Sequence, residues 1–265
     1  MKTKPSTATI GIDLGDKKHA VCVLGESGDI LREGSIPNRR PSLDKLSAEY
    51  PGALMVMEVG MHSPWTSRYL EGLGHRVVVA NPRKVRAISS NERKCDRRDA
   101  EMLARLARSD EKLLHPVHHG TAEAQRDLLQ IKLRDNLVRQ RVDVISAVRF
   151  TLKSMGIRLP SPHSECFARH ARAILEREDP KLLEQLEPSL HVLDAMTEQI
   201  RALDKAIGEL AATNYPESEY LTQIHGVGTI TALTFILTIG DPTRFRRRRD
   251  VAAFLGLVPR RDQSG

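Results

Sequence analysis

Two aspartates, Asp96 and Asp99, lie three residues apart near the start of residues 94–108, a segment rich in Ala, Leu, Met, Glu and Arg. These residue types are strong helix formers, so the sequence predicts a helix here. Residues three apart lie on one face of a helix, and both carboxylates can point at one spot. Such a pair suits a hard divalent cation such as Mg²⁺. The structural alternative makes Asp96 a helix cap and Asp99 a partner of the helix dipole.

Two further acids end strand-like segments upstream. Residues 8–13 form a β-rich run that ends at Asp13, and residues 53–59 form a nearly continuous apolar run that contains Glu58. Continuous apolar runs are typical of buried parallel strands, and ligands of α/β sheets gather at the carboxyl ends of such strands. Together with the aspartate pair, these acids form a candidate two-metal centre for phosphoryl transfer.

The elements that must position these acids alternate along the first half of the chain. Three strand-like runs follow one another through tight turns, at residues 8–13, 19–24 and 30–36. Three antiparallel strands with an acid in the first are typical of the opening of a ribonuclease-H-like fold. The remaining predicted elements of this α/β layer structure are a helix over 43–50, the strand over 53–59, a helix over 63–73 with Ser63 as N-cap, and a strand over 75–80.

A long helical region follows, with no Gly or Pro between residues 121 and 155. Apolar residues recur there at alternating three- and four-residue steps, and they do so again after a break at residues 156–162. Such seams are typical of a coiled coil, either an antiparallel hairpin or a pairing between subunits, although plain packing within one chain explains them equally well. The predicted seam residues are Val138, Val142, Ile145, Val148, Leu152 and Met155, then Leu193, Met196, Ile200, Leu203, Ile207 and Leu210.

The C-terminal part combines a glycine-rich turn with clustered arginines. The turn resembles half of a helix-hairpin-helix, in which Gly226 and Gly228 let the backbone approach a phosphate, although a simple turn between helices explains it as well. Seven arginines and three aspartates lie between residues 241 and 265, an excess of four positive charges. This cluster favours contacts to a nucleic-acid backbone. The arginines concerned are Arg244, Arg246, Arg247, Arg248, Arg249, Arg260 and Arg261.

Composition points to a basic globular protein. The 265 residues suffice for one large domain or two smaller ones, and 40% are hydrophobic and 28% charged. The net charge of +7 favours a polyanionic partner, most simply nucleic acid. Three widely spaced cysteines form no zinc-ligand pattern, and neither a signal peptide nor a membrane-spanning stretch is evident. We therefore expect a cytoplasmic protein.

On these motifs the chain resembles a known group, the Piv/MooV DNA invertases and the insertion-sequence transposases grouped with them, the family numbered one hundred and ten. The resemblance covers nearly the whole chain, and the order of the motifs is as specific as the motifs themselves. The matching residues are Ile-Gly-Ile-Asp at 10–13, Met-Glu at 57–58, Asn-Pro at 81–82, Lys-Cys-Asp-Arg-Arg-Asp-Ala at 94–100, Ile-His-Gly-Val-Gly at 224–228 and the stretch 254–265.

The resemblance implies an α/β ribonuclease-H-like (RuvC-like) DEDD domain over residues 1–118. It implies an α-helical coiled-coil and dimerisation region over residues 119–214, followed by a small helical C-terminal transposase domain over residues 215–265. The partners it implies are DNA and a structured guide RNA, in a homodimer or a tetramer.

The resemblance also implies a division of catalytic roles. The four acids would bind Mg²⁺ or Mn²⁺. Ser264, in the terminal Arg-Asp-Gln-Ser-Gly motif, would attack a DNA phosphodiester and form a transient phosphoserine link. Family members continue past this motif, whereas this chain has one residue after Ser264. We therefore expect a truncated C-terminal domain and a chain that is poorly active or inactive in recombination.

Two other functions fit part of the pattern. The first is a RuvC-like nuclease that cuts structured DNA with metal-activated water, which the four acids support equally well. The second is a non-enzymatic DNA- or RNA-binding protein, in which the acids are helix caps and ion-pair partners. A covalent protein–DNA adduct that requires Ser264 would separate the transposase from both.

Overall fold

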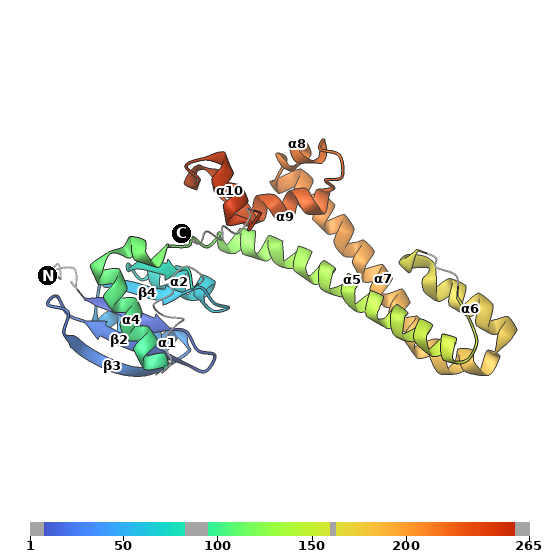
Figure 1. Ribbon diagram of the computed structural model, residues 1–265, viewed down its shortest axis with the longest axis horizontal. Helices are drawn as coiled ribbons and strands as arrows, with labels where there is room; N and C mark the ends of the chain where they lie inside the picture. Colours follow the sequence, from blue (N-terminus) through green and yellow to red (C-terminus); the bar gives the residue numbers. More distant parts are fainter. Residues whose placement is uncertain (1–7, 83–94, 160–162, 258–265) are drawn as a thin grey trace, which may run out of the picture. The chain divides into compact units, whose positions relative to one another are not determined.

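A computed structural model describes residues 8–82, 95–159 and 163–257. The chain divides into two compact units, Met1–His119 and Gly120–Gly265. The first is a mixed α/β layer structure and the second is helical (Figure 1). Among the described residues, no helix has the length and apolar character needed to cross a membrane. The predicted order, a sheet with helices followed by a helical region, is confirmed.

A five-stranded sheet in the order β3-β2-β1-β4-β5 forms the centre of the first unit. β1, β2 and β3 pair in antiparallel fashion, whereas β1, β4 and β5 are parallel. Short apolar runs between turn residues define these strands, which is why the predicted ranges agree with the structure to within one residue. The strands are β1 (Thr9–Asp13), β2 (Lys18–Leu24), β3 (Ile30–Pro37), β4 (Leu54–Glu58) and β5 (Arg76–Ala80).

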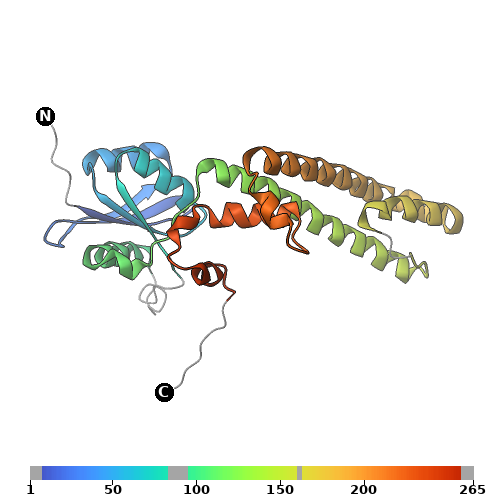
Figure 2. The same cartoon turned by 90° about the horizontal axis from the view of Figure 1, so that it is seen from above.

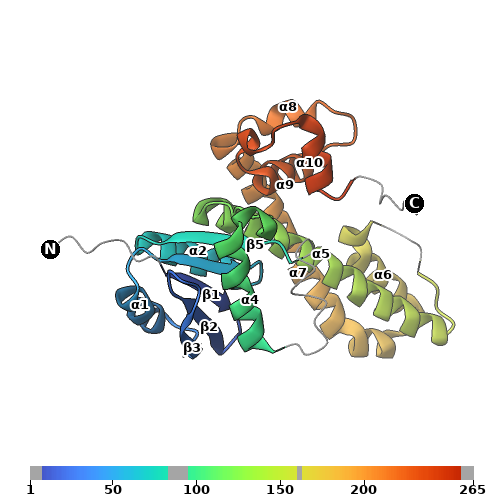
Figure 3. The ribbon, with the colours of Figure 1, turned by 60° about the vertical axis from the view of Figure 1, so that its left-hand side comes forward.

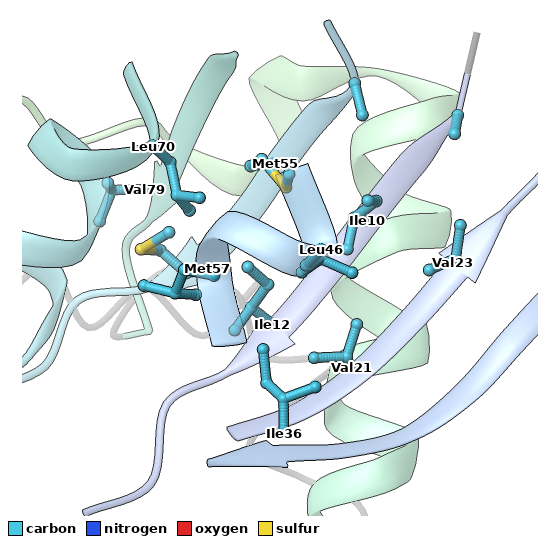
Figure 4. Close-up of a cluster of buried hydrophobic side chains, with 13 residues drawn as sticks. Ile10, Ile12, Val21, Val23, Ile36, Leu46, Met55, Met57, Leu70 and Val79 are labelled. Carbon is cyan, nitrogen blue, oxygen red and sulfur yellow. The ribbon is translucent and has the colours of Figure 1, made fainter. Parts of the chain in front are cut away.

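Helices cover both faces of this sheet (Figure 2). On one face, α1 (Arg40–Glu49) and α2 (Ser63–Gly72) contribute Leu46 and Leu70 to a core that also holds alternate side chains of the strands (Figure 4). On the other face, α4 (Asp96–Ser109) packs its buried alanines and Leu103 against the sheet. Residues two apart along a strand share a face, so the two cores use alternate residues of the same strands.

Two expectations about helix caps are wrong. α2 begins at Ser63, so its N-cap is His62, and the Ser63 hydroxyl instead accepts a hydrogen bond from the Gly60 N–H at 3.0 Å. α4 begins at Asp96 with Cys95 as its N-cap, and no side chain caps it. Asp96 is therefore a residue of the first helical turn, and the reading of this acid as a helix cap does not hold.

Helix α4 approaches β1 backbone to backbone at Gly11. A Cβ atom placed on Gly11 would overlap the carbonyl oxygen of Ala100 and would lie 2.9 Å from the amide nitrogen of Ala104. Both alanines are fully buried. Glycine is thus required at this point for steric reasons, and the small helix residues opposite it let the two backbones meet.

The second unit is built on two long helices, α5 (Ala122–Ser154) and α7 (Pro180–Asn214), which pack against each other in antiparallel fashion. α6 (Phe167–Glu178) packs on α7 near the turn that joins the long helices. α8 (Ser218–Thr222) and α9 (Thr229–Ile239) pack at the other end of this pair (Figure 3). The last described helix, α10 (Arg248–Phe254), follows α9 along the chain.

The contact between α5 and α7 follows a seam that differs in part from the prediction. Val142 and Met155 were expected in the seam of α5, but 46% and 58% of their surfaces are exposed. Arg141 is buried beside Ile145 instead, and its guanidinium donates to Thr197 Oγ1 at 3.3 Å. The remaining residues expected in the seams are buried or half-buried.

A second polar pair lies one heptad away in the same seam, where Arg134 donates to Asp204 Oδ1 at 2.8 Å. Charged side chains thus occupy seam positions. A seam predicted from apolar residues alone therefore selects Val142 in place of its neighbour Arg141. In this structure the two helices pair with each other within one chain.

We expect Gly11→Ala to lower the free energy of unfolding by about 1–3 kcal/mol, because the added methyl group forces α4 away from β1. Urea denaturation followed by circular dichroism measures this change. Gly34→Ala is the matched control, since a Cβ on this strand glycine meets nothing within 4 Å. Equal unfolding midpoints for the two variants would show that the close approach is not needed.

Candidate active site

Two of the predicted acids end neighbouring strands. Asp13 is the last residue of β1 and Glu58 is the last residue of β4. These strands are parallel and in register, so both acids leave the sheet at the same edge. Strand alternation places Asp13 on the face of Gly11, which is the face that α4 covers, and Glu58 lies on that same face. Both acids are half-buried.

Helix α4 brings the third acid to the same edge. Arg108, near the end of α4, donates to the Gly25 carbonyl at 3.0 Å, close to the amino end of β1. The start of α4 therefore lies toward the carboxyl end of β1, where Asp13 stands. Asp99 immediately precedes Ala100, which contacts Gly11, and only 7% of Asp99 is exposed. Asp96, one turn earlier, is exposed.

The structure thus places Asp13, Glu58 and Asp99 on one face at one edge of the sheet, with Asp96 at the rim. Carboxylate oxygens are the ligands that Mg²⁺ prefers. In the described ranges, however, no group of three or more His, Cys, Asp or Glu residues is arranged to hold a metal ion.

Two histidines near the same edge of the sheet were missed by the sequence analysis. His19 of β2 is fully buried on the face opposite α4, and neither ring nitrogen has a hydrogen-bond partner among the described residues. His62 accepts a hydrogen bond from the Trp65 indole at 3.4 Å and lies 3.4 Å from an Asp16 carboxylate oxygen. Burial, and then the charge of His62, lower the pKa of His19. A polar residue within the apolar run of β2 was the signal that could have identified it.

The C-terminal arginines fall into different environments. Arg244 is half-buried, with its guanidinium carbon 4.6 Å from the ring centre of Phe245 and 4.5 Å from that of Phe254. This stacking ties Arg244 to the packing of α10. The four arginines at residues 246–249 are exposed. Arg260, Arg261 and Ser264 lie outside the described residues.

The glycine turn begins α9. Gly226 has a φ of 84°, in the left-handed region that favours glycine, and Gly228 is the N-cap of α9 without a side-chain cap. A hollow of about 340 Å³ adjoins this helix start, and Arg134 is among the residues that line it. Backbone N–H groups at an uncapped helix start can bind an anion.

Comparison with known proteins defines the class of this chain. A transposase profile of the DEDD type matches residues 10–157, and a second profile, described as Transposase IS116/IS110/IS902 family, matches residues 218–265. The first profile covers the sheet, α4 and the whole of α5, and the second covers the C-terminal helices. The chain is therefore a transposase.

Similar curated proteins carry the same description along nearly the whole chain. A transposase for the insertion sequence element IS1328 from Yersinia enterocolitica is 30% identical, over 98% of this chain and 76% of the relative. A transposase for the element IS1111A from Coxiella burnetii is 26% identical, over 97% of this chain and 70% of the relative. The chain belongs to the IS110 family of transposases.

Membership of this family confirms the predicted resemblance and has two direct consequences. A transposase is a DNA-processing enzyme, so DNA is its partner. A DEDD-type transposase domain also suggests the use of a divalent metal ion. Family membership does not assign roles to single residues, because those roles depend on the chemistry at the sheet edge.

We expect the stability of the protein to fall as the pH drops below about 6.5, the usual pKa of histidine. Burial lowers the pKa values of His19, His75 and His119. In the pH range between the lowered values and about 6.5, the unfolded chain therefore binds protons that the folded chain does not, and the free energy of unfolding rises with pH. Urea denaturation across this range measures the slope. We expect His19→Gln to flatten it and the exposed His118→Gln to leave it unchanged.

We expect Arg244→Ala to loosen α10, with a loss of about 0.5–2 kcal/mol from the two stacked rings. Amide hydrogen exchange measures the effect locally, and the α10 amides should exchange faster while those of the α5–α7 pair do not. Arg246→Ala removes the same charge from an exposed position and is the matched control. Equal exchange in the two variants would mean that the stacking contributes no local stability.

Proposed function

We propose that this chain cuts and joins DNA by phosphoryl transfer at the edge of the sheet where β1, β4 and the start of α4 meet. The observation that carries this proposal is the placement of Asp13, Glu58 and Asp99 on one face at that edge. Carboxylate oxygens are the ligands that Mg²⁺ prefers, and three separate elements here supply them to the same edge of the sheet.

In this proposal Asp13, Glu58, Asp96 and Asp99 hold Mg²⁺ or Mn²⁺. When bound, such ions neutralise charge on the scissile phosphate and make a hydroxyl easier to deprotonate. Strand pairing sets Asp13 opposite Glu58. The approach of α4 at Gly11 brings the start of that helix, which carries Asp99, toward the same edge of the sheet. Asp96, being exposed, is free to turn toward an ion that arrives with the DNA.

We further propose that Ser264 is the nucleophile. Its hydroxyl oxygen would bond to the phosphorus of a DNA phosphodiester, and the bond from phosphorus to one DNA oxygen would break. A general base would accept the proton of the serine hydroxyl. The departing DNA oxygen would then take up a proton. This step rests on the family resemblance of the Arg-Asp-Gln-Ser-Gly motif, since Ser264 lies outside the described residues.

Nucleic-acid contacts of the C-terminal part belong to the same proposal. The uncapped start of α9, with Gly226 and Gly228, can receive a phosphate, and the exposed arginines at 246–249 can neutralise others. Arg244 stacks on Phe245 and Phe254 and so contributes to packing, while Arg260 and Arg261 extend the basic sequence. A structured guide RNA as a second ligand is part of the proposal through the family resemblance.

The architecture supports three further proposals. The mixed sheet, with its first three strands antiparallel and its acids at strand ends, supports a ribonuclease-H-like, RuvC-like assignment for residues 1–118. The heptad spacing between α5 and α7 supports a coiled-coil region over residues 119–214, and residues 215–265 would form the transposase domain. Assembly into a dimer or tetramer would use surfaces other than the internal seam.

The test is a Mg²⁺-dependent reaction with labelled DNA, with any co-purifying RNA retained, followed by denaturing electrophoresis. We expect a covalent protein–DNA band that Ser264→Ala abolishes and that Asp13→Asn reduces at least about 100-fold, through the loss of a metal ligand. Asp29→Asn, in an exposed loop, is the control.

The other outcomes identify the rival functions. Cleaved DNA without a covalent adduct, dependent on Asp13 and independent of Ser264, would contradict the serine mechanism and indicate a nuclease that uses activated water. Binding without reaction would contradict the enzymatic proposal altogether.

A further inference from the structure

One asparagine holds the turn that joins β1 to β2 and that directly follows the first of the four acids. The side-chain amide of Asn38 donates to the Gly15 carbonyl at 3.2 Å and to the Asp16 carbonyl at 3.0 Å. The backbone N–H of Asn38 donates to the Lys17 carbonyl at 3.0 Å. Three consecutive carbonyls of the turn thus accept hydrogen bonds from a single residue.

Asn38 reaches this turn because of the order of the strands. β1 and β3 lie on either side of β2 and run in the same direction, so both strands end at the same edge of the sheet. Asn38 directly follows Pro37, the last residue of β3, and Pro37 pairs with Lys18, the first residue of β2. Asn38 therefore lies beside the turn, at the edge that carries the acids.

The backbone of the turn is closely bent and lies outside the strand ladder. A Cβ atom on Gly15 would lie 2.3 Å from the Lys18 carbonyl oxygen, so the chain folds back tightly on itself here. The ladder between β1 and β2 ends at the pair of Asp13 with Ala20, and the carbonyls of the turn need other partners. An asparagine amide carries two N–H donors and satisfies two of these carbonyls at once.

The main chain at Asp13 is consequently held on both sides. Before the turn, Asp13 is fixed by its place in the ladder opposite Ala20. After it, Leu14 packs against the core that α1 and α2 cover, and Asn38 holds the residues that follow. Neighbouring strand residues point to opposite faces, so these contacts leave the Asp13 side chain directed to the face of α4.

The same turn also meets the loop that follows the second acid. An Asp16 carboxylate oxygen lies 3.4 Å from Nε2 of His62. His62 lies between Glu58, the last residue of β4, and the start of α2. The turn is thus connected to the end of β3 through Asn38 and to the loop after β4 through Asp16.

We propose that Asn38 is a positioning residue, whose hydrogen bonds to the turn hold the Asp13 carboxylate where it binds a metal ion. The inference rests on the proposed function, in which Asp13 is a metal ligand. Hydrogen bonds that orient metal ligands typically account for about 10–100-fold in metal affinity. We expect an effect of about tenfold, at the lower end of this range, because Asn38 acts through the backbone rather than on the carboxylate itself.

The test is a double-mutant cycle on the full chain, with Asn38→Ala and Asp13→Asn made singly and together. Calorimetric titration measures Mn²⁺ binding to the complex of each variant with a duplex DNA of mixed sequence. Asn38→Ala should weaken Mn²⁺ binding about tenfold in the otherwise wild-type chain. It should weaken binding less than about twofold when Asp13→Asn is already present, because a residue that acts through Asp13 loses its effect with that carboxylate.

Two further variants separate positioning from general stability. Ser47→Ala removes the 2.7 Å hydrogen bond between Ser47 Oγ and His75 Nε2 in the same unit. His75 precedes β5, so this bond lies toward the other edge of the sheet, and Mn²⁺ binding should match the wild type. Asn38→Gln keeps the amide donors on a longer side chain and should bind Mn²⁺ more tightly than Asn38→Ala. It takes the place of Asn38→Ala in the cycle if that variant does not fold.

Three results would overturn the inference. Wild-type Mn²⁺ affinity of Asn38→Ala, beside weakened binding by Asp13→Asn, would show that the turn does not position the acid and would leave the proposed function intact. Equal losses from Asn38→Ala with and without Asp13→Asn would reduce the effect to one on the fold. Wild-type Mn²⁺ affinity of Asp13→Asn would remove Asp13 from the metal centre, so that the proposed function fails together with the inference.

Discussion

Strand β1 and helix α4 meet backbone to backbone at Gly11, where even a methyl group would overlap the carbonyl oxygen of Ala100. This contact sets the depth and the axial position of α4 on the sheet, because the neighbouring buried helix residues are alanines that leave no other spacing. The position of Asp99 relative to Asp13 follows from it. A larger residue at position 11 would act on the acids through the displacement of a whole helix.

In the second unit, polar pairs inside the seam between α5 and α7 fix the alignment of the two helices. Arg134 with Asp204, and Arg141 with Thr197, are formed only in one alignment of α5 against α7. Apolar seams alone tolerate a slip of one heptad, whereas a slip here would leave the buried Arg141 without its hydroxyl partner. We infer that these pairs specify the alignment, which in turn fixes where α9 packs on α5 and α7.

The sequence was sufficient for features that depend on local pattern. Strand limits, the helix at residues 96–109 and the family resemblance all follow from apolar runs, turn residues and motif order. Features that depend on tertiary contacts could not be predicted from local sequence pattern. The difference in burial between Asp96 and Asp99, the seam position of Arg141 and the stacking of Arg244 arise from packing partners distant in sequence. The isolated His19 in an apolar strand is the one such feature with a visible sequence signal.

The central claim is that acids from β1, β4 and α4 form one metal centre when DNA is present. Calorimetric titration of Mn²⁺ into the DNA complex of the protein tests it most directly, with Asp13→Asn, Asp99→Asn and the exposed Asp143→Asn as variants. The account predicts that Asp13→Asn and Asp99→Asn each weaken the same binding step by about 10–100-fold, whereas Asp143→Asn matches the wild type. Wild-type Mn²⁺ binding by Asp99→Asn would contradict the account, because α4 would then contribute nothing to the centre.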